Sequence, residues 1–93
     1  MNVIYSENFY DQIDKIKDTS IVRRALQAVE KFRTANSLHE ITNIKAMQDF
    51  PTFYRLRFGD FRIGFQLTDN NEIKLLAIDH RSKIYRLFPK NFA

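Results

Sequence analysis

The chain contains no cysteine, which excludes a disulfide framework and any thiolate metal site. This absence fits a reducing compartment. The first residues, Met1 to Glu7, lack the pattern of a signal peptide, and no apolar run approaches the roughly 20 residues of a membrane span. We therefore expect a cytoplasmic protein that has no contact with a membrane.

Other chemistries are also missing from the sequence. The only two histidines, His39 and His80, lie far apart and lack the spacing of metal ligands. No glycine-rich phosphate-binding loop occurs, and no serine or cysteine lies in a nucleophile motif. We expect neither a metal nor an organic cofactor.

The residues that are present describe one small basic domain, residues 1–93. Hydrophobic residues make up 44% and charged residues 28% of the chain, which is a globular composition. The formal net charge is +4. Such a surplus favours polyanions, which include nucleic acid, an anionic membrane and an acidic protein partner.

The first half of the chain predicts a strand followed by a helical hairpin. The strand covers residues 2–5, and Ser6 can cap a helix over residues 7–17. Ser20 can cap a second helix over residues 21–35, whose basic residues Arg23, Arg24, Lys31 and Arg33 face outward. The short link between the helices favours antiparallel packing. Residues 36–52 form either a short helix or a connector, and Pro51 ends this segment in both cases.

The second half predicts an antiparallel meander. Two alternating segments, residues 53–58 and 61–67, flank a two-residue turn at Gly59-Asp60, and a further strand covers residues 72–79 before a tail over residues 80–93. The predicted class is α+β: an N-terminal strand and a helical hairpin packed on a curved antiparallel sheet.

The turn at Gly59-Asp60 sets the register of this hairpin. Arg57 then lies opposite Arg62, and Arg55 lies opposite Gly64. Because side chains alternate between faces, one face is apolar and should be covered by the helices: Tyr54, Leu56, Phe58, Phe61, Ile63 and Phe65. The other face carries Arg55, Arg57, Arg62, Gly64 and Gln66.

This arginine cluster is the most informative feature of the sequence. Like charges directly opposed on a sheet cost stability, and guanidinium groups match phosphate geometry. A two-residue turn at Asn70-Asn71 would place Ala77 opposite Gly64 and Asp79 opposite Arg62. We then expect a groove floored by Gly64 and Ala77 and walled by guanidinium groups. The alternative is a solvated face whose arginines pair with scattered acids.

The tail adds three candidates. His80 can transfer a proton near neutral pH, or it forms only a local hydrogen bond at the strand end. Arg81 can stabilise a charged transition state, or it pairs with Asp79. Tyr85 can stack on a base or donate to a phosphate, or it belongs to the core.

Three segments together resemble the RelE/ParE superfamily of bacterial toxins. They are Asn43–Met47, Tyr54–Ile63 with its YRLRFGDFRI sequence, and Ile78–Arg86 with its HR and IY pairs. The resemblance covers almost the whole chain. It implies a microbial RNase-like fold and, for the RelE/HigB-like branch, metal-independent cleavage of messenger RNA on the ribosome. A 2′-hydroxyl would attack the adjacent phosphorus and leave a 2′,3′-cyclic phosphate.

The resemblance also implies catalytic positions. The basic residues of the RelE branch map to Arg55, Arg57, Arg62 and Arg81, and its tyrosine maps to Tyr85. Two of the matched hairpin positions are often lysine in RelE, whereas here they are Arg55 and Arg57. Since arginine stays protonated and is a poor general base, we hypothesise that His80 transfers the proton while the arginines stabilise the charge on phosphorus.

Two rival interpretations remain. The ParE branch shares the fold and inhibits DNA gyrase, and a non-catalytic relic would only bind its partner. In each case the resemblance implies a cognate antitoxin protein, which would also carry any contact with operator DNA. A basic groove suits an acidic or amphipathic segment that folds over it.

Overall fold

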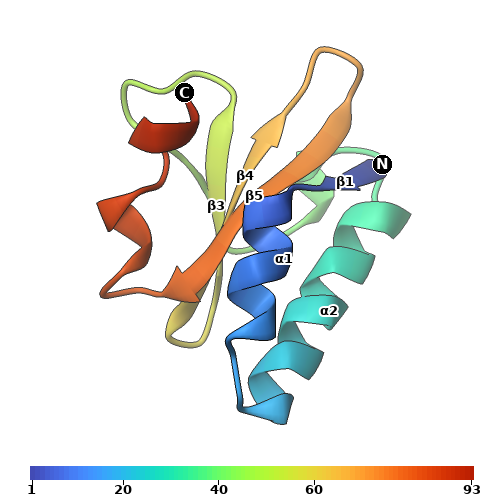
Figure 1. The fold of residues 1–93 in the computed structure, drawn as a ribbon. Helices are drawn as coiled ribbons and strands as arrows, with labels where there is room; N and C mark the ends of the chain where they lie inside the picture. The colour runs from blue at the N-terminus through green and yellow to red at the C-terminus, as the bar shows by residue number, and fades with distance from the viewer.

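A computed structural model of the protein describes residues 1–93 as two helices packed on one face of a five-stranded sheet (Figure 1). The elements are β1 (Asn2–Tyr5), α1 (Glu7–Asp14), α2 (Thr19–Thr34), β2 (Ile44–Ala46), β3 (Phe53–Phe58), β4 (Phe61–Leu67) and β5 (Glu72–His80), with short 3-10 turns at Leu38–Glu40, Ile84–Arg86 and Lys90–Phe92. The predicted α+β class is confirmed. Neither α1 nor α2 combines the length and apolar composition that a membrane-spanning helix requires.

The sheet has the strand order β1-β5-β4-β3-β2. Strands β2 to β5 are antiparallel to their neighbours, whereas β1 joins the free edge of β5 as a parallel strand. A parallel neighbour requires a long crossover connection, and the chain between β1 and β5 includes both helices and the rest of the sheet. The antiparallel helical hairpin is confirmed (Figure 1).

Of the two predicted helix caps, one is confirmed and one is wrong. Ser6 caps α1, because its hydroxyl oxygen accepts a hydrogen bond from the Phe9 amide at 3.1 Å. The prediction that Ser20 caps the second helix is wrong. Asp18 is the cap, its carboxylate accepting from the Ser20 amide at 2.9 Å, and α2 therefore begins at Thr19. Residues 15–18 are needed to reverse the chain, so α1 ends earlier than predicted.

The uncertain connector contains a strand. Only Leu38–Glu40 is helical, as a single 3-10 turn, and Ile44–Ala46 forms β2 by pairing with Tyr54, Arg55 and Leu56. A three-residue edge strand is too short to show an alternating pattern. Its existence depends on the free hydrogen-bonding edge of β3, which only the assembled sheet provides.

The predicted register of the β3–β4 hairpin is confirmed. Arg57 pairs with Arg62, and Arg55 pairs with Gly64. Gly59 has a φ of +56°, at the first turn position where a two-residue hairpin of type II′ needs a positive φ.

The predicted partners of β4 and β5 are confirmed, but the turn between the two strands differs from the prediction. Arg62 pairs with Asp79 and Gly64 with Ala77, as predicted, but the turn comprises three residues, Asp69 to Asn71, instead of two. A β-bulge at Leu76 adds one residue to β5 and restores the register beyond it. The bulge interrupts the alternation between faces, and the consecutive residues Leu76 and Ala77 both pack in the same small core cluster.

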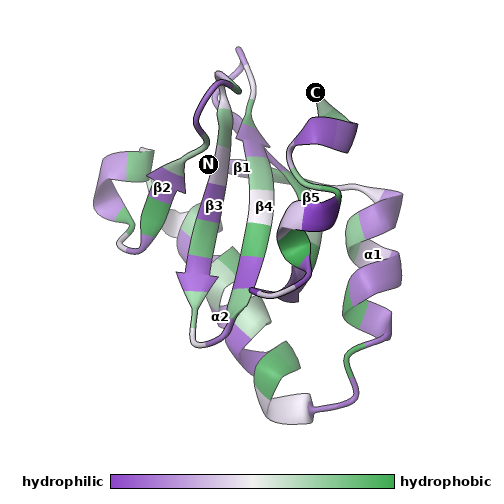
Figure 2. Ribbon diagram, turned by 90° about the vertical axis from the view of Figure 1, so that its left-hand side faces the viewer, coloured by the Kyte–Doolittle hydropathy of each residue, from purple (hydrophilic) through white to green (hydrophobic).

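The hydrophobic core lies on both faces of the sheet. The helices cover the main cluster, which includes Leu56, Ile63 and Phe65 from the predicted apolar face. On the other face, the C-terminal tail buries a second cluster: Phe53, Leu76, Ala77, Ile84 and Phe88. Figure 2 shows the tail in front of β5, while β3, on the other side of β4, is uncovered. The arginine-bearing face is thus only partly open, because the tail supplies a second apolar layer.

Candidate functional site

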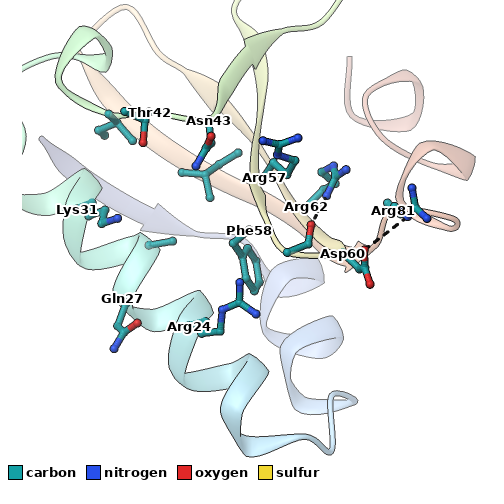
Figure 3. Close-up of a pocket in the computed structure, with 14 residues that line it drawn as sticks. Arg24, Gln27, Lys31, Thr42, Asn43, Arg57, Phe58, Asp60, Arg62 and Arg81 are labelled. Atoms are coloured by element: carbon teal, nitrogen blue, oxygen red, sulfur yellow. Dashed lines mark hydrogen bonds and ion pairs between the residues drawn. The ribbon is translucent and has the colours of Figure 1, made fainter.

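A groove of about 740 Å³ lies between α2 and the tip of the β3–β4 hairpin (Figure 3). One wall is α2, one end is the segment that leads into β2, and the other wall is the hairpin with the residue that follows β5. The lining residues are Arg24, Gln27, Ala28, Lys31, Ile41, Thr42, Asn43, Leu56, Arg57, Phe58, Gly59, Asp60, Arg62 and Arg81.

The groove is strongly cationic. Five lining side chains are positively charged, namely Arg24, Lys31, Arg57, Arg62 and Arg81, and Asp60 is the single carboxylate. Asp60 and Arg81 are 3.7 Å apart, but both side chains are largely exposed, so this ion pair contributes little. A concave surface lined by charges of one sign concentrates the field, and the groove therefore suits an anion.

Arg57 and Arg62 are the two directly opposed cations of this groove. Neither arginine forms an ion pair with a carboxylate. One terminal nitrogen of Arg62 donates to the backbone carbonyls of Gly59 and Phe61, both at 3.0 Å, which orients the guanidinium at the hairpin tip. Asp79 lies opposite Arg62, but its carboxylate accepts a hydrogen bond from the His80 amide at 2.8 Å. The alternative in which scattered acids neutralise these arginines is therefore wrong.

The predicted floor of the groove is also wrong. Gly64 and Ala77 are buried, and Ala77 is only 2% exposed, because the ring of Phe88 lies directly over Gly64. The tail thus occupies the space in which a ligand groove was predicted. Arg55 shares the face of Arg57 but lies outside the groove lining, and its guanidinium donates to the Asn43 carbonyl at 3.3 Å.

His80 does not join the arginines as expected. It pairs with Phe61 on β4, its ring lies 5.7 Å from the Phe61 ring, and both residues line a separate hollow beside α1 and the link to α2. Alternation along β5 places Asp79 and His80 on opposite faces. The Nδ1 atom of His80 accepts from the Ser82 amide at 3.1 Å and lies 2.8 Å from the Ser82 hydroxyl.

Of the other two tail candidates, only Arg81 reaches the groove. Arg81 lines the groove, and its backbone amide donates to the Asp60 carbonyl at 2.7 Å. Tyr85 lies on the turn Ile84–Arg86, outside the groove lining, with 48% of its surface exposed. It is therefore an exposed aromatic residue and not part of the core.

Sequence reasoning missed two cationic residues of this site. Arg24 and Lys31 were expected simply to face outward, but they line the wall of the groove that faces the hairpin. Residues seven apart lie two turns apart on the same face of a helix, and the buried Ala28 lies between them. The seven-residue spacing indicates that Arg24 and Lys31 share one face of α2. It does not reveal that the tip of the β3–β4 hairpin lies opposite that face.

Comparison with known proteins gives a consistent result. The family model described as "ParE toxin of type II toxin-antitoxin system, parDE" matches residues 3–85. The chain is 28% identical over 90 residues to Toxin RelE3 of Methanocaldococcus jannaschii, covering 96% of this chain and all of that protein. Among solved structures, it superposes on a chain of the RelB-RelE antitoxin-toxin complex from Methanococcus jannaschii with a TM-score of 0.78 and 26% identity, over 92% of this chain and 99% of that one.

A more distant structure shares the fold. The isolated E. coli RelE toxin superposes with a TM-score of 0.62 at 16% identity, covering 99% of this chain and 98% of that one. The superposition extends over nearly the entire length of both chains, so the tail that covers the second face lies within the shared fold.

Proposed function

Because the chain belongs to the family of ParE toxins of type II toxin–antitoxin systems, within the RelE/ParE superfamily, we propose that it is a toxin that acts as an endoribonuclease on messenger RNA. One observation carries this proposal. Arg57 and Arg62 are directly opposed on the hairpin wall of a groove with five cationic side chains, and no carboxylate pairs with either of them. Folding alone does not favour such an arrangement, whereas an RNA phosphate would neutralise it.

The proposed reaction is an internal transfer at phosphorus. The 2′-oxygen of one ribose attacks the adjacent phosphorus, its proton leaves, the bond to the 5′-oxygen breaks, and that oxygen takes up a proton. The products are a 2′,3′-cyclic phosphate and a 5′-hydroxyl. Arg57, Arg62 and Arg81 would stabilise the negative charge that develops on the phosphoryl oxygens, and the two carbonyl contacts of Arg62 hold its guanidinium in place for this role.

The remaining predicted residues have less direct places in this proposal. The guanidinium of Arg55 donates to the carbonyl of Asn43, which lines the groove, and the ring of Tyr85 is exposed. A longer strand of RNA would contact this cation and this aromatic ring. The proton-transfer role hypothesised for His80 is untested, and the position of its ring in a different hollow argues against it.

The test is a map of RNA ends. Purified protein is added to a translating extract, and cut messages are mapped by primer extension, with and without EDTA. We expect discrete cuts that end in a 2′,3′-cyclic phosphate and that persist in EDTA. Intact messages at a protein concentration that arrests translation in the extract would refute the nuclease proposal. Cuts in translated messages only would support action on the ribosome.

A second candidate function is inhibition of DNA gyrase. The observation in its favour is the description of the matching family model, which names the ParE toxin. Incubation of the protein with gyrase and supercoiled DNA separates the two candidates. Loss of gyrase activity together with intact RNA would favour this function, and a non-catalytic relic would affect neither.

We also propose that a cognate antitoxin protein binds this chain. The similar chain from Methanococcus jannaschii was solved in complex with RelB, and an acidic or amphipathic segment could neutralise the cationic groove. Any contact with operator DNA would then pass through the antitoxin. Co-expression with the neighbouring reading frame tests this, since a true antitoxin should co-purify with the chain and restore growth.

A further inference from the structure

The guanidinium of Arg24 is held against the tip of the hairpin. Its central carbon lies 5.6 Å from the centre of the Phe58 ring, as a cation–π contact (Figure 3). Its terminal nitrogens occupy the space beside Gly59, where a Cβ atom would lie 3.0 and 3.1 Å from them. A glycine at position 59 therefore meets two needs: it adopts the positive φ of the turn, and it leaves room for the guanidinium of Arg24.

This guanidinium has no anionic partner. The protein contains two ion pairs, Arg33 with Glu30 and Arg81 with Asp60, and neither involves Arg24 or Lys31. An arginine that packs against a ring and a turn and keeps its donors unpaired is prepared for an anion, because these contacts already restrict its side chain before it binds. Lys31 lies two turns further along the same wall and is also exposed.

We infer that Arg24 and Lys31 bind phosphates of the RNA strand beyond the cleaved linkage, so that the strand crosses the groove from the hairpin arginines to α2. The inference rests on the proposed RNA substrate and extends it from a single phosphate to a path. Both residues act in binding and not in the reaction itself, because they lie on the wall opposite Arg57 and Arg62.

The composition of the groove favours RNA over a helical segment of an antitoxin. Helices that dock in grooves bury an apolar stripe, but only four of the 14 lining residues are hydrophobic. A strand recognised through its backbone needs instead a row of cations. Arg24 and Lys31 on one wall, with Arg57 and Arg62 on the other, meet that need.

The test measures binding without cleavage. The probe is a short single-stranded 2′-O-methyl RNA of mixed sequence, in which the attacking hydroxyl is blocked. We compare Arg24→Gln and Lys31→Gln with Arg23→Gln, which removes the same charge from an exposed position of α2 outside the groove. Each groove variant should weaken binding by about 5- to 10-fold and lower the slope of log Kd against log salt by about 0.7. Arg23→Gln should change binding by less than about 2-fold.

Kinetics and a conservative variant complete the test. On cleavable RNA, both groove variants should raise KM and leave kcat within about 2-fold, as expected when uniform binding is lost. Arg24→Lys keeps the charge without the planar fork and should fall between wild type and Arg24→Gln.

The outcomes separate this inference from the proposed function. If Arg24→Gln and Lys31→Gln behave like Arg23→Gln while wild type still cuts RNA, the inference is overturned and the nuclease stands. The same holds if they bind the probe normally but lose the antitoxin. If wild type neither binds nor cuts RNA, the proposed function fails and the inference fails with it.

Discussion

Phe88 packs on Gly64 so closely that a Cβ atom at Gly64 would lie 2.7 Å from three carbons of the Phe88 ring. A glycine in the middle of a strand normally weakens a sheet. Here it allows the C-terminal tail to lie flat on β4 and to bury the second core cluster. The space above Gly64, where a ligand groove was predicted, is thus filled by the ring of Phe88 as part of the core.

The first prediction concerns this contact. Gly64→Ala should lower the free energy of unfolding by about 1–3 kcal/mol, because the added methyl overpacks against the ring. Urea unfolding measures the change. In a Phe88→Ala background the same substitution should cost less than about 0.5 kcal/mol, since the two residues are in contact and their effects are not additive. Equal costs in both backgrounds would contradict the contact.

The second prediction concerns the opposed arginines. Arg62→Gln should reduce RNA cleavage by about 10²- to 10³-fold, since it removes an oriented donor to the developing charge. The free energy of unfolding should change by less than about 1 kcal/mol, because relief of the like-charge repulsion with Arg57 offsets the loss of two carbonyl hydrogen bonds. Arg33→Gln, which breaks only an exposed ion pair with Glu30, is the matched control and should keep full activity. A cleavage rate equal to that of the control would remove Arg62 from the site.

The third prediction concerns His80. His80→Gln should leave cleavage within about 2-fold of wild type, because its ring lies on the other face and its Nδ1 atom is engaged by Ser82. Single-turnover cleavage across pH 5 to 9 is the measurement, roughly the range in which a histidine proton donor or acceptor would change the profile. A loss of about 10²-fold with an altered pH profile would instead establish the proton-transfer role.

The fourth prediction concerns acid stability at the start of α2. The hydroxyl of Ser20 donates to the Asp18 carboxylate at 2.7 Å, and with the Ser20 amide it holds the pKa of Asp18 below its ordinary value of 3.8. A folded-state pKa below the unfolded one means that the charged cap stabilises the protein above pH 3.8 and loses this contribution as the pH falls through the folded value. Asp18→Asn keeps a capping oxygen without the titration.

Thermal unfolding of both proteins between pH 7 and pH 2 checks this, a range of about five pH units that brackets the ordinary carboxyl pKa. The melting temperature of wild type should exceed that of Asp18→Asn at neutral pH, and the difference should shrink as the acid form appears. Parallel curves would show that the charge of Asp18 makes no contribution to the cap.

The accuracy of the sequence-based predictions follows the range of the interactions involved. The β3–β4 register was predictable because Gly59-Asp60 is a local turn and the apolar residues alternate on both sides of it. The pairing of Gly64 with Ala77 was predicted correctly although the turn was not, since the longer turn and the bulge at Leu76 cancel. The cap at Asp18 was missed because Asp18 and Ser20 both suit a helix start.

The candidate site was only partly predictable for the same reason. Arg57, Arg62 and Arg81 lie in or next to elements whose register the sequence reveals. Arg24 and Lys31 reach the groove only because α2 packs beside the hairpin tip, a relationship between segments about 30 residues apart. The separation of His80 from the arginines follows from strand alternation, which places Asp79 and His80 on opposite faces of β5.

By itself, the sequence determined the α+β class, the hairpin register and the placement of the arginines on one pleated face, because turns and period-2 alternation are local properties of the chain. The tertiary structure alone decided which part of that face stays open. Phe88 covers Gly64 and closes one half, while α2 brings Arg24 and Lys31 to the other half and makes it a groove. Contacts between distant segments depend on how the layers pack, and no local pattern encodes them.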